Sequence, residues 1–341
     1  MENRAWRFHD YGGSEVMRLE TVELAEPGPG EVLVRIKAAG LNRSDLLWTG
    51  AGFFKPELPA QLGCEICGVI ERCGPDVEGF ATGDRVNNLP VFTRGAEYAY
   101  ANFADYAVIP VAELIHTPDD LSDAEGAAFL FTNLTQICAL TETVQLRAGQ
   151  TLLITAATSA NGLSAIHHGR QLGARVIATT RSADKRNLLL EAGADAVVAT
   201  DSETLSERVA EITGGQGADV IYDCVGGALT NELVRSLRPG GEWVMYGYLD
   251  PSPFTSEWPL WFAHQPVLHV YSLTQYTGMR ELNLPGRPIE LRRAIDAVKA
   301  LCGSGAIPVP IARTFKGIEQ VQEAFRLMEA NVGGGKIVVE F

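Results

Sequence analysis

The pattern of apolar and polar positions changes character near residue 122. Before it, short segments of alternating apolar and polar residues are broken by glycine and proline: MRLETVELA, EVLVRIKAAG, CGVIERCG and FADYAVIP. Such segments are typical of strands in a mainly β, partly open barrel. The stretches GLNRSDLLW and GAGFFKPELPAQLG between them are predicted as loops or short helices, where binding residues tend to collect. We expect residues 1–122 to form a β domain that carries the substrate side of a site.

After residue 122, helices and strands alternate. Ser122 and Glu125 have the spacing of a capping box, which predicts a helix through AAFLFTNLTQICALTE. From residue 151, near-continuous apolar strands (TLLITA, RVIATT, AVVAT, ADVIYDCVG, EWVMYG) alternate with amphipathic helices. This order predicts a doubly wound parallel sheet covered on both faces, and so an α/β fold class. We assign residues 123–305 to this domain.

The remaining segments complete the expected organisation. The apolar run at residues 267–273 is predicted as an edge strand, which either pairs with a second copy of the chain or is covered within it. A helix across IELRRAIDAVKALCG follows it. Residues 306–341 are expected to form a strand, a helix and a strand, and that helix carries Ile318, Val321, Phe325 and Met328 on one face.

Composition and charge limit the classes of partner and the cellular location that we expect. The formal net charge is −14 and the pI is near 4.9, which disfavours nucleic acid and anionic membrane surfaces as partners. The chain shows neither a signal-peptide pattern nor a run of about 20 apolar residues, so a cytoplasmic location is expected. Six dispersed cysteines are expected to be reduced thiols. The spacing of Cys64 and Cys67 leaves half a zinc site or a redox dithiol open, although buried small hydrophobes are the expected reading.

A dinucleotide loop is predicted between the strand TLLITA and the next helix. Its first two glycine positions hold Ala157 and Ser159, and only Gly162 keeps the pattern G-x-G-x-x-G. Small residues still let the backbone approach a pyrophosphate, and the amides at the start of the helix supply positive charge. The predicted contacts are Ala157, Ser159, Ala160, Asn161 and Gly162.

The end of the next strand bears on the choice of cofactor. NAD sites place an acidic residue there, whereas this chain has Thr180, Arg181 and Ser182, with Lys185 one turn later. Cationic and hydroxyl groups suit a 2′-phosphate, so NADPH is predicted over NADH. The alternative is a solvated helix start with Ser182 as its N-cap. Further cofactor contacts are predicted at the ends of later strands, where plain turns are the alternative: Val225, Gly226, Tyr246, Gly247 and Tyr248.

Together these segments resemble a family. PGPGEVLVRIKAAGLNRSD, GVIERCGPDVEGFATGDRV, FADYAVIP, GQTLLITAATSANGLSAI, DCVGG, RPGGEWVMYG and GKIVVEF occur in the order found in the medium-chain dehydrogenase/reductase superfamily. Within it, the chain resembles the zinc-lacking quinone oxidoreductase and enoyl reductase branch. The resemblance implies a GroES-like β domain interrupted by a Rossmann domain, with the last segment returning to the first domain. It also implies a homodimer.

The resemblance also implies that the chain needs no zinc. Zinc-dependent members place ligands at positions that match Asn42, Cys64 with Glu65, and apparently Phe131. One thiol and one carboxylate fall short of the three protein ligands of a catalytic zinc, so no metal is expected. His167 and His168 are neighbours on a helix, about 100° apart, and are not expected to share a metal.

Without a Lewis acid, reduction of a quinone, or of a C=C bond conjugated to a carbonyl, fits better than alcohol oxidation. Hydride would come from the nicotinamide, and hydrogen-bond donors would meet the developing enolate. By resemblance, Asn42 and Asp45 are the catalytic candidates at the nicotinamide end; Asp45 is equally expected as a helix cap. Asn42 is also a predicted cofactor contact, orienting the substrate or the ribose, and Thr135 is another. The residues that flank the last glycine run, Asn331 and Lys336, are further predicted cofactor contacts, with a plain hairpin turn as the equal alternative.

A pocket for a small apolar or aromatic electrophile is predicted from aromatic residues, about half of which are also plausible as core. Its predicted members are Phe53, Phe54, Tyr98, Tyr100, Phe103, Trp258 and Trp261, together with Cys64. An enoyl-thioester reductase, a non-catalytic NADPH-binding protein and, as a minor case, a zinc-dependent alcohol dehydrogenase stay open as alternatives.

Overall fold

The computed structural model describes residues 2–50, 55–90, 102–280, 282–330 and 334–341. The chain divides into two compact units: unit 1 comprises residues 1–131 and 274–341, and unit 2 comprises residues 132–273. The first boundary falls inside helix α3 (Asp123–Ile137). Residues 123–131 and 274–305, which we assigned to the doubly wound domain, thus group with unit 1.

Unit 1 consists of two β-sheets packed around an apolar core that includes Trp6, Phe8, Ile66 and Phe325. In its described residues, one sheet has the order β2-β1-β4; the other has the order β15-β16-β3-β5-β6-β8, with β7 also paired to β3. The last strand returns to the first part of the chain, as expected. The strands are β1 (Glu2–Phe8), β2 (Met17–Glu23), β3 (Glu31–Gly40), β4 (Ala60–Gln61), β5 (Ile66–Cys73), β6 (Arg85–Asn88), β7 (Tyr106–Pro110), β8 (Leu114–His116), β15 (Ile311–Lys316) and β16 (Lys336–Glu340).

Short helices join these strands, and α11 packs against β16 and the 3-10 turn η1. The predicted capping box at the start of α3 is confirmed, because Ser122 and Glu125 exchange side-chain and backbone hydrogen bonds. The helices assigned to unit 1, besides the first part of α3, are η1 (Ser14–Val16), α1 (Arg43–Thr49), η2 (Val111–Glu113), α9 (Thr274–Thr277), α10 (Pro288–Gly303), η6 (Ile318–Gln320) and α11 (Val321–Glu329).

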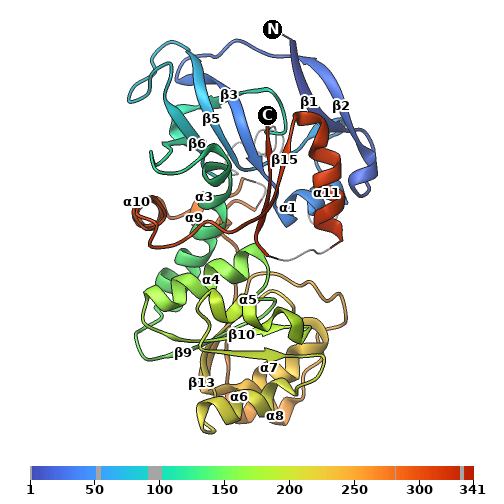
Figure 1. Ribbon diagram of the computed structural model, residues 1–341, viewed down its shortest axis with the longest axis vertical. Coiled ribbons are helices and arrows are strands. Elements are labelled where there is room, and N and C mark those ends of the chain that lie inside the picture. The colour runs from blue at the N-terminus through green and yellow to red at the C-terminus, as the bar shows by residue number, and fades with distance from the viewer. Residues whose placement is uncertain (1, 51–54, 91–101, 281, 331–333) are drawn as a thin grey trace. The chain divides into compact units, whose positions relative to one another are not determined.

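Unit 2, whose residues the structure describes completely, is a six-stranded parallel sheet in the order β11-β10-β9-β12-β13-β14. Figure 1 shows α4 and α5 on one face of the sheet and α6, α7 and α8 on the other. The strands are β9 (Thr151–Ile154), β10 (Arg175–Thr180), β11 (Ala196–Ala199), β12 (Ala218–Asp223), β13 (Leu237–Met245) and β14 (Val267–Val270). The helices are η3 (Cys138–Thr143), α4 (Ala160–Gln171), η4 (Ala183–Lys185), α5 (Arg186–Glu191), α6 (Leu205–Thr213), η5 (Gly227–Leu229), α7 (Thr230–Ser236) and α8 (Trp258–His264).

This strand order confirms the doubly wound fold. The sheet grows outward in opposite directions from β9 and β12, and ligands of such folds bind at the carboxyl ends of the strands at that point. Buried apolar side chains such as Leu153, Ile177 and Ile221 fill the interior of the sheet, as the near-continuous apolar strands predict. The fold therefore places the predicted dinucleotide loop, which follows β9, where such a ligand would bind.

Two strands differ from the expectation. The pattern of polar residues in ENRAWRF did not predict β1, whose buried positions include Ala5, Trp6 and Phe8. β13 starts at Leu237 and includes the turn-like Pro239, because its pairing with β12 shifts register between Ala218 and Val220. Among the described residues, no helix has both the length and the apolar character needed to cross a membrane.

Candidate functional site

The loop between β9 and α4 presents backbone N–H groups at the carboxyl edge of the sheet in unit 2. Ser159 is the N-cap of α4, and its hydroxyl accepts a hydrogen bond from the N–H of Gly162 at 3.0 Å. Ser is a preferred cap because its side chain satisfies a helix amide that otherwise lacks a partner. Ala156 has φ of 45°, a conformation that favours glycine. This loop precedes the positive end of a 12-residue helix.

Gly162 is the glycine that this loop requires. A Cβ atom at Gly162 would lie 2.4 Å from the Cα atom of Ala157, which is itself fully buried. The third glycine of a dinucleotide fingerprint serves this close packing of helix against strand. The replacement of the other two glycines by Ala157 and Ser159 is therefore compatible with the loop, whereas a side chain at Gly162 is not.

Asp223 connects this loop to the end of β12, and the sequence analysis did not single it out. One carboxylate oxygen accepts hydrogen bonds from the Thr155 hydroxyl at 2.6 Å and from the N–H of Val225 at 2.9 Å. The other accepts from the N–H of Gly226 at 3.1 Å. Burial raises the pKa of Asp223, while these hydrogen bonds lower it. Its position at the end of an apolar strand was the available signal.

The predicted 2′-phosphate contacts lie together after β10. Thr180 ends the strand, and its hydroxyl donates to the carbonyl oxygen of Ser182 at 3.2 Å. Arg181 is exposed and Lys185 half-buried. The Ser182 hydroxyl donates to the carboxylate of Asp184. The segment after β10 thus holds two cationic side chains, Arg181 and Lys185, and one acidic side chain, Asp184. The sequence analysis did not consider Asp184.

The other predicted contacts in unit 2 are distributed over two strand ends. Gly226 has φ of 62° and ψ of −138°, so Val225-Gly226 forms a turn that needs glycine. After β13, a Cβ at Gly247 would approach that of Cys224 to 3.2 Å. The Tyr246 ring stacks on that of Tyr222 at 4.1 Å between centroids, whereas Tyr248 is exposed.

Helix α3 brings a further polar group to the loop. The side-chain N–H of Gln136 donates to Asn161 Oδ1 at 2.9 Å, and within unit 2 its buried Oε1 atom has no hydrogen-bond donor. Thr135, one residue before it, is buried, and its carbonyl oxygen accepts from the Tyr271 hydroxyl at 3.0 Å. Buried polar atoms are normally paired, so this oxygen is one of a few exceptions in unit 2.

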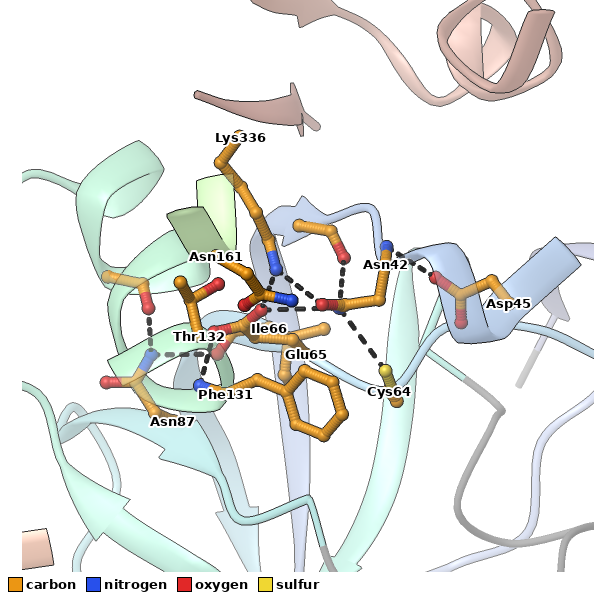
Figure 2. Close-up of polar contacts among 12 residues, drawn as sticks. Asn42, Asp45, Cys64, Glu65, Ile66, Asn87, Phe131, Thr132, Asn161 and Lys336 are labelled. Atoms are coloured by element: carbon orange, nitrogen blue, oxygen red, sulfur yellow. Dashed lines mark hydrogen bonds and ion pairs between the residues drawn. The ribbon is translucent and has the colours of Figure 1, made fainter. Parts of the chain in front are cut away.

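In unit 1, sheet pairing brings together residues that are far apart in the sequence. β16 pairs with β3 (Val338 opposite Gly40), and β3 pairs with β5 (Ala39 opposite Ile66). Lys336 at the start of β16, Asn42 after β3 and Glu65 before β5 therefore meet at one edge of the sheet, as Figure 2 shows. We call Asn42, Asp45, Cys64, Glu65 and Lys336 the Lys336 cluster.

The cluster is bonded internally. The Lys336 ammonium contacts Glu65 Oε2 at 2.7 Å and donates to Asn42 Oδ1 at 2.5 Å. The Asn42 amide donates to Cys64 Sγ and to Glu65 Oε2, both at 3.3 Å, and Glu65 Oε1 accepts from the N–H of Phe131 at 2.9 Å. These contacts direct the Asn42 amide into the protein. Lys336 is thus a buried ion-pair partner.

Asp45 is both the predicted helix cap and a buried acid. Its Oδ2 accepts from the N–H of Asn42 at 2.8 Å, which confirms its capping role at the start of α1. Burial raises the pKa of Asp45 to about 7, against the lowering effect of that hydrogen bond and of Lys336. Burial likewise raises the pKa of the Cys64 thiol well above its usual range. Asp45 thus titrates near neutral pH.

Most of the cysteines, and His168, are buried, as their interpretation as structural residues predicts. All six cysteines are free thiols, and five of them, including Cys64 and Cys67, are buried. His168 is buried, its Nε2 lies 2.9 Å from Asn133 Oδ1, and burial lowers its pKa to about 3. In the described ranges, no group of three or more His, Cys, Asp and Glu residues is arranged to hold a metal ion.

The predicted aromatic pocket is only partly covered by the structure. Phe53, Phe54, Tyr98, Tyr100 and Asn331 lie outside the described residues. Phe103 is buried in the core of unit 1. On α8, Trp261 packs against the core residue Trp243 at 6.1 Å between ring centroids, whereas the side chain of Trp258 is exposed. Phe103 and Trp261 therefore have clear packing roles.

Known protein families and curated relatives match both units of this architecture. Residues 28–119 match the family described as "Alcohol dehydrogenase GroES-like domain", and residues 161–279 match "Zinc-binding dehydrogenase". A Salmonella typhimurium protein named "Quinone oxidoreductase" is 32% identical over 338 residues, covering 96% of each chain. A Burkholderia "2-haloacrylate reductase" is 32% identical over 247 residues, covering 70% of this chain and 72% of that protein.

A solved structure is similar to this chain over nearly its whole length. Escherichia coli quinone oxidoreductase complexed with NADPH has a TM-score of 0.87 and 27% identity, and the match covers 99% of this chain and 100% of that one. The zinc-binding description applies to residues 161–279, which contain no member of the Lys336 cluster. From its near-complete match to a curated relative and its two domain types, the chain belongs to the medium-chain dehydrogenase/reductase superfamily, in the quinone oxidoreductase-like branch.

Proposed function

We propose that the protein is an NADPH-dependent oxidoreductase. It transfers hydride to a quinone or to the C=C bond of an α,β-unsaturated carbonyl compound. The observation that carries this proposal is the loop after β9, which keeps the required Gly162 at the point where a doubly wound sheet binds dinucleotides. The near full-length match to a quinone oxidoreductase and the match to 2-haloacrylate reductase support the substrate class.

The residues of unit 2 fit NADPH. The pyrophosphate would lie against Ala157, Ser159, Ala160, Asn161 and Gly162, where the amides at the start of α4 face a ligand. Arg181 and Lys185, with Thr180 and Ser182, would hold the 2′-phosphate through charge-assisted hydrogen bonds. The unpaired oxygen of Gln136, next to Asn161, and the turns at Gly226 and Gly247 are further places for cofactor contacts.

The bound cofactor would supply the hydride, and the protein would supply position and charge. Asn42 and Asp45 are proposed to shape the reacting end of the site. Since the amide of Asn42 is bonded inward, its role is to position its neighbours rather than to donate to the substrate. Proton delivery from solvent requires no further side chain.

A homodimer formed along β14 belongs to the same proposal. β14 is the edge strand of the sheet in unit 2, and the side chains of Val267 and Val270 are 47% and 65% exposed. An apolar edge strand of this kind pairs readily with another chain. Replacement Val267→Lys is expected to yield monomers in analytical ultracentrifugation, whereas Leu190→Lys, on the half-exposed α5, leaves the dimer intact. A monomeric unaltered protein would remove this part of the proposal.

A cytoplasmic location is the remaining part of the proposal. The strongly negative chain and six free thiols support it.

Oxidation of NADPH and of NADH, followed with a panel of quinones, enals, enones and 2-haloacrylates, tests the activity. Turnover with NADPH and at least one class of acceptor is expected. A preference for NADH would contradict the assignment of Arg181 and Lys185. NADPH binding without turnover on any acceptor would favour a non-catalytic nucleotide-binding protein instead.

A further inference from the structure

Lys336 is the cation of a buried cluster in which three other members, Asn42, Cys64 and Glu65, match by resemblance the positions of zinc ligands in zinc-dependent members of the superfamily. Only 4% of its side chain and 2% of that of Glu65 are exposed. A buried ammonium is costly unless a carboxylate and further hydrogen bonds compensate it. Here Glu65 Oε2 at 2.7 Å and Asn42 Oδ1 at 2.5 Å provide that compensation.

The surrounding residues converge on the ammonium in the manner of a ligand set. Of the positions that match zinc ligands in the superfamily, Asn42 and Glu65 contact the ammonium directly. Cys64 contacts the Asn42 amide, and the Phe131 ring lies beneath the ammonium, 5.9 Å from Nζ to its centroid. A divalent ion bound to the same oxygens would lie against a fixed positive charge, so ammonium and metal ion would compete for one place.

We propose that Lys336 is a built-in cation: its ammonium occupies the place that a metal ion takes in zinc-dependent members of the superfamily, and it closes the cluster to divalent metals. The lysine neutralises Glu65 and fixes the amide of Asn42. A covalently attached cation has no open coordination position, so it maintains the shape of the site without acting as a Lewis acid. The inference concerns the cluster alone and does not depend on which substrate is reduced.

The first test measures whether Lys336 and Glu65 act as a pair. Lys336→Met is expected to lower Tm by about 6–10 °C, because it leaves a buried carboxylate without its cation. The double variant Lys336→Met with Glu65→Gln is expected to recover at least half of that loss. Lys316→Met is the matched control: the Lys316 side chain is 84% exposed, its Nζ is 3.5 Å from Glu340 Oε2, and its loss is expected to change Tm by less than about 2 °C.

Each outcome of this test decides the proposal. A folded double variant supports it even where Lys336→Met alone is insoluble. If Lys336→Met costs no more than Lys316→Met, or if the double variant is no more stable than Lys336→Met, the lysine does not compensate Glu65 and the proposal fails.

The second test measures metal exclusion directly with Co²⁺, whose thiolate complexes absorb light. Asn42→Cys places a second thiol beside Cys64 and Glu65 while keeping Lys336. Adding Lys336→Met to it is expected to give one bound Co²⁺ per chain and at least tenfold higher affinity than Asn42→Cys alone. Equal affinity of the two variants, no thiolate absorption in either, or one equivalent of metal in the unaltered protein would each overturn the proposal.

Discussion

The dinucleotide loop of unit 2 and the Lys336 cluster of unit 1 are both rich in polar groups at strand ends, but they use them in opposite ways. Near the loop, Arg181 after β10 is exposed, and an oxygen of Gln136 on α3 lacks a partner within the unit. In the cluster, Lys336, Glu65 and Asn42 bond to one another and are buried. Lys336, Glu65 and Asn42 therefore satisfy one another as a structural support does, whereas Arg181 keeps its charge available to a ligand.

The largest effect is expected from a substitution that disrupts the loop between β9 and α4. Gly162→Val would force a side chain into the space held by the Cα and carbonyl of Ala157, so the loop must move. We expect NADPH affinity to fall by at least about 100-fold and stability by about 3 kcal/mol. Fluorescence titration with NADPH and thermal unfolding measure both. An unchanged affinity would show that the loop does not hold the cofactor.

A smaller effect is expected on the stability of the Lys336 cluster, which should depend on pH through Asp45. The pKa of Asp45, about 7, lies above its ordinary value of 3.8, so the folded chain holds a proton that the unfolded chain releases between those values. The stability contributed by this proton is complete below about pH 4 and is lost as the pH rises through 7. Relative to Asp45→Asn, the unaltered protein is expected to lose about 2.5 kcal/mol between pH 5 and 7.5. Denaturant unfolding at several pH values checks this, and parallel pH profiles for the two proteins would exclude it.

The positive charge after β10 is tested by Arg181→Ala. Loss of one charge-assisted contact to the 2′-phosphate is expected to raise the KM for NADPH about tenfold and to change that for NADH by less than about threefold. Arg175→Ala is the matched control, because Arg175 is exposed at the opposite end of the same strand. Equal changes for both cofactors would place the 2′-phosphate elsewhere.

The smallest expected effect concerns the backbone of the loop. Ala156 has φ of 45°, where glycine is favoured over alanine. Ala156→Gly is expected to stabilise the protein by about 0.5 kcal/mol, which raises Tm by about 1–2 °C, without weakening NADPH binding. A marked destabilisation would mean that the methyl group of Ala156 contributes packing that outweighs the backbone preference.

Much of unit 2 was predictable because its information is local. The apolar strands, the helix starts and the register of Gly162 can be read from short stretches of sequence, and the order of the strands follows from the doubly wound fold. Asp223 was accessible to the same reasoning, since a carboxylate at the end of an apolar strand needs polar partners, and here it accepts from backbone N–H groups.

The Lys336 cluster was not predictable in this way. Lys336 and Asn42 are 294 residues apart, and only the pairing of β16 with β3 brings them together. Beside a glycine run, the lysine was expected to lie in a loop near the cofactor, whereas it begins a strand and is buried. β1 was missed because its outward-facing charged residues mask the inward positions of Trp6 and Phe8.

The placement of β16 against β3 also has a consequence for biosynthesis. A ribosome releases residues 132–273 before residues 336–340 exist, so unit 2 has its whole sequence available while β3 still lacks one neighbour and Glu65 its ammonium. Domains generally fold as units during synthesis. The nascent chain therefore carries an unfinished sheet until β16 is translated, and a stop codon before Lys336 would leave that sheet open.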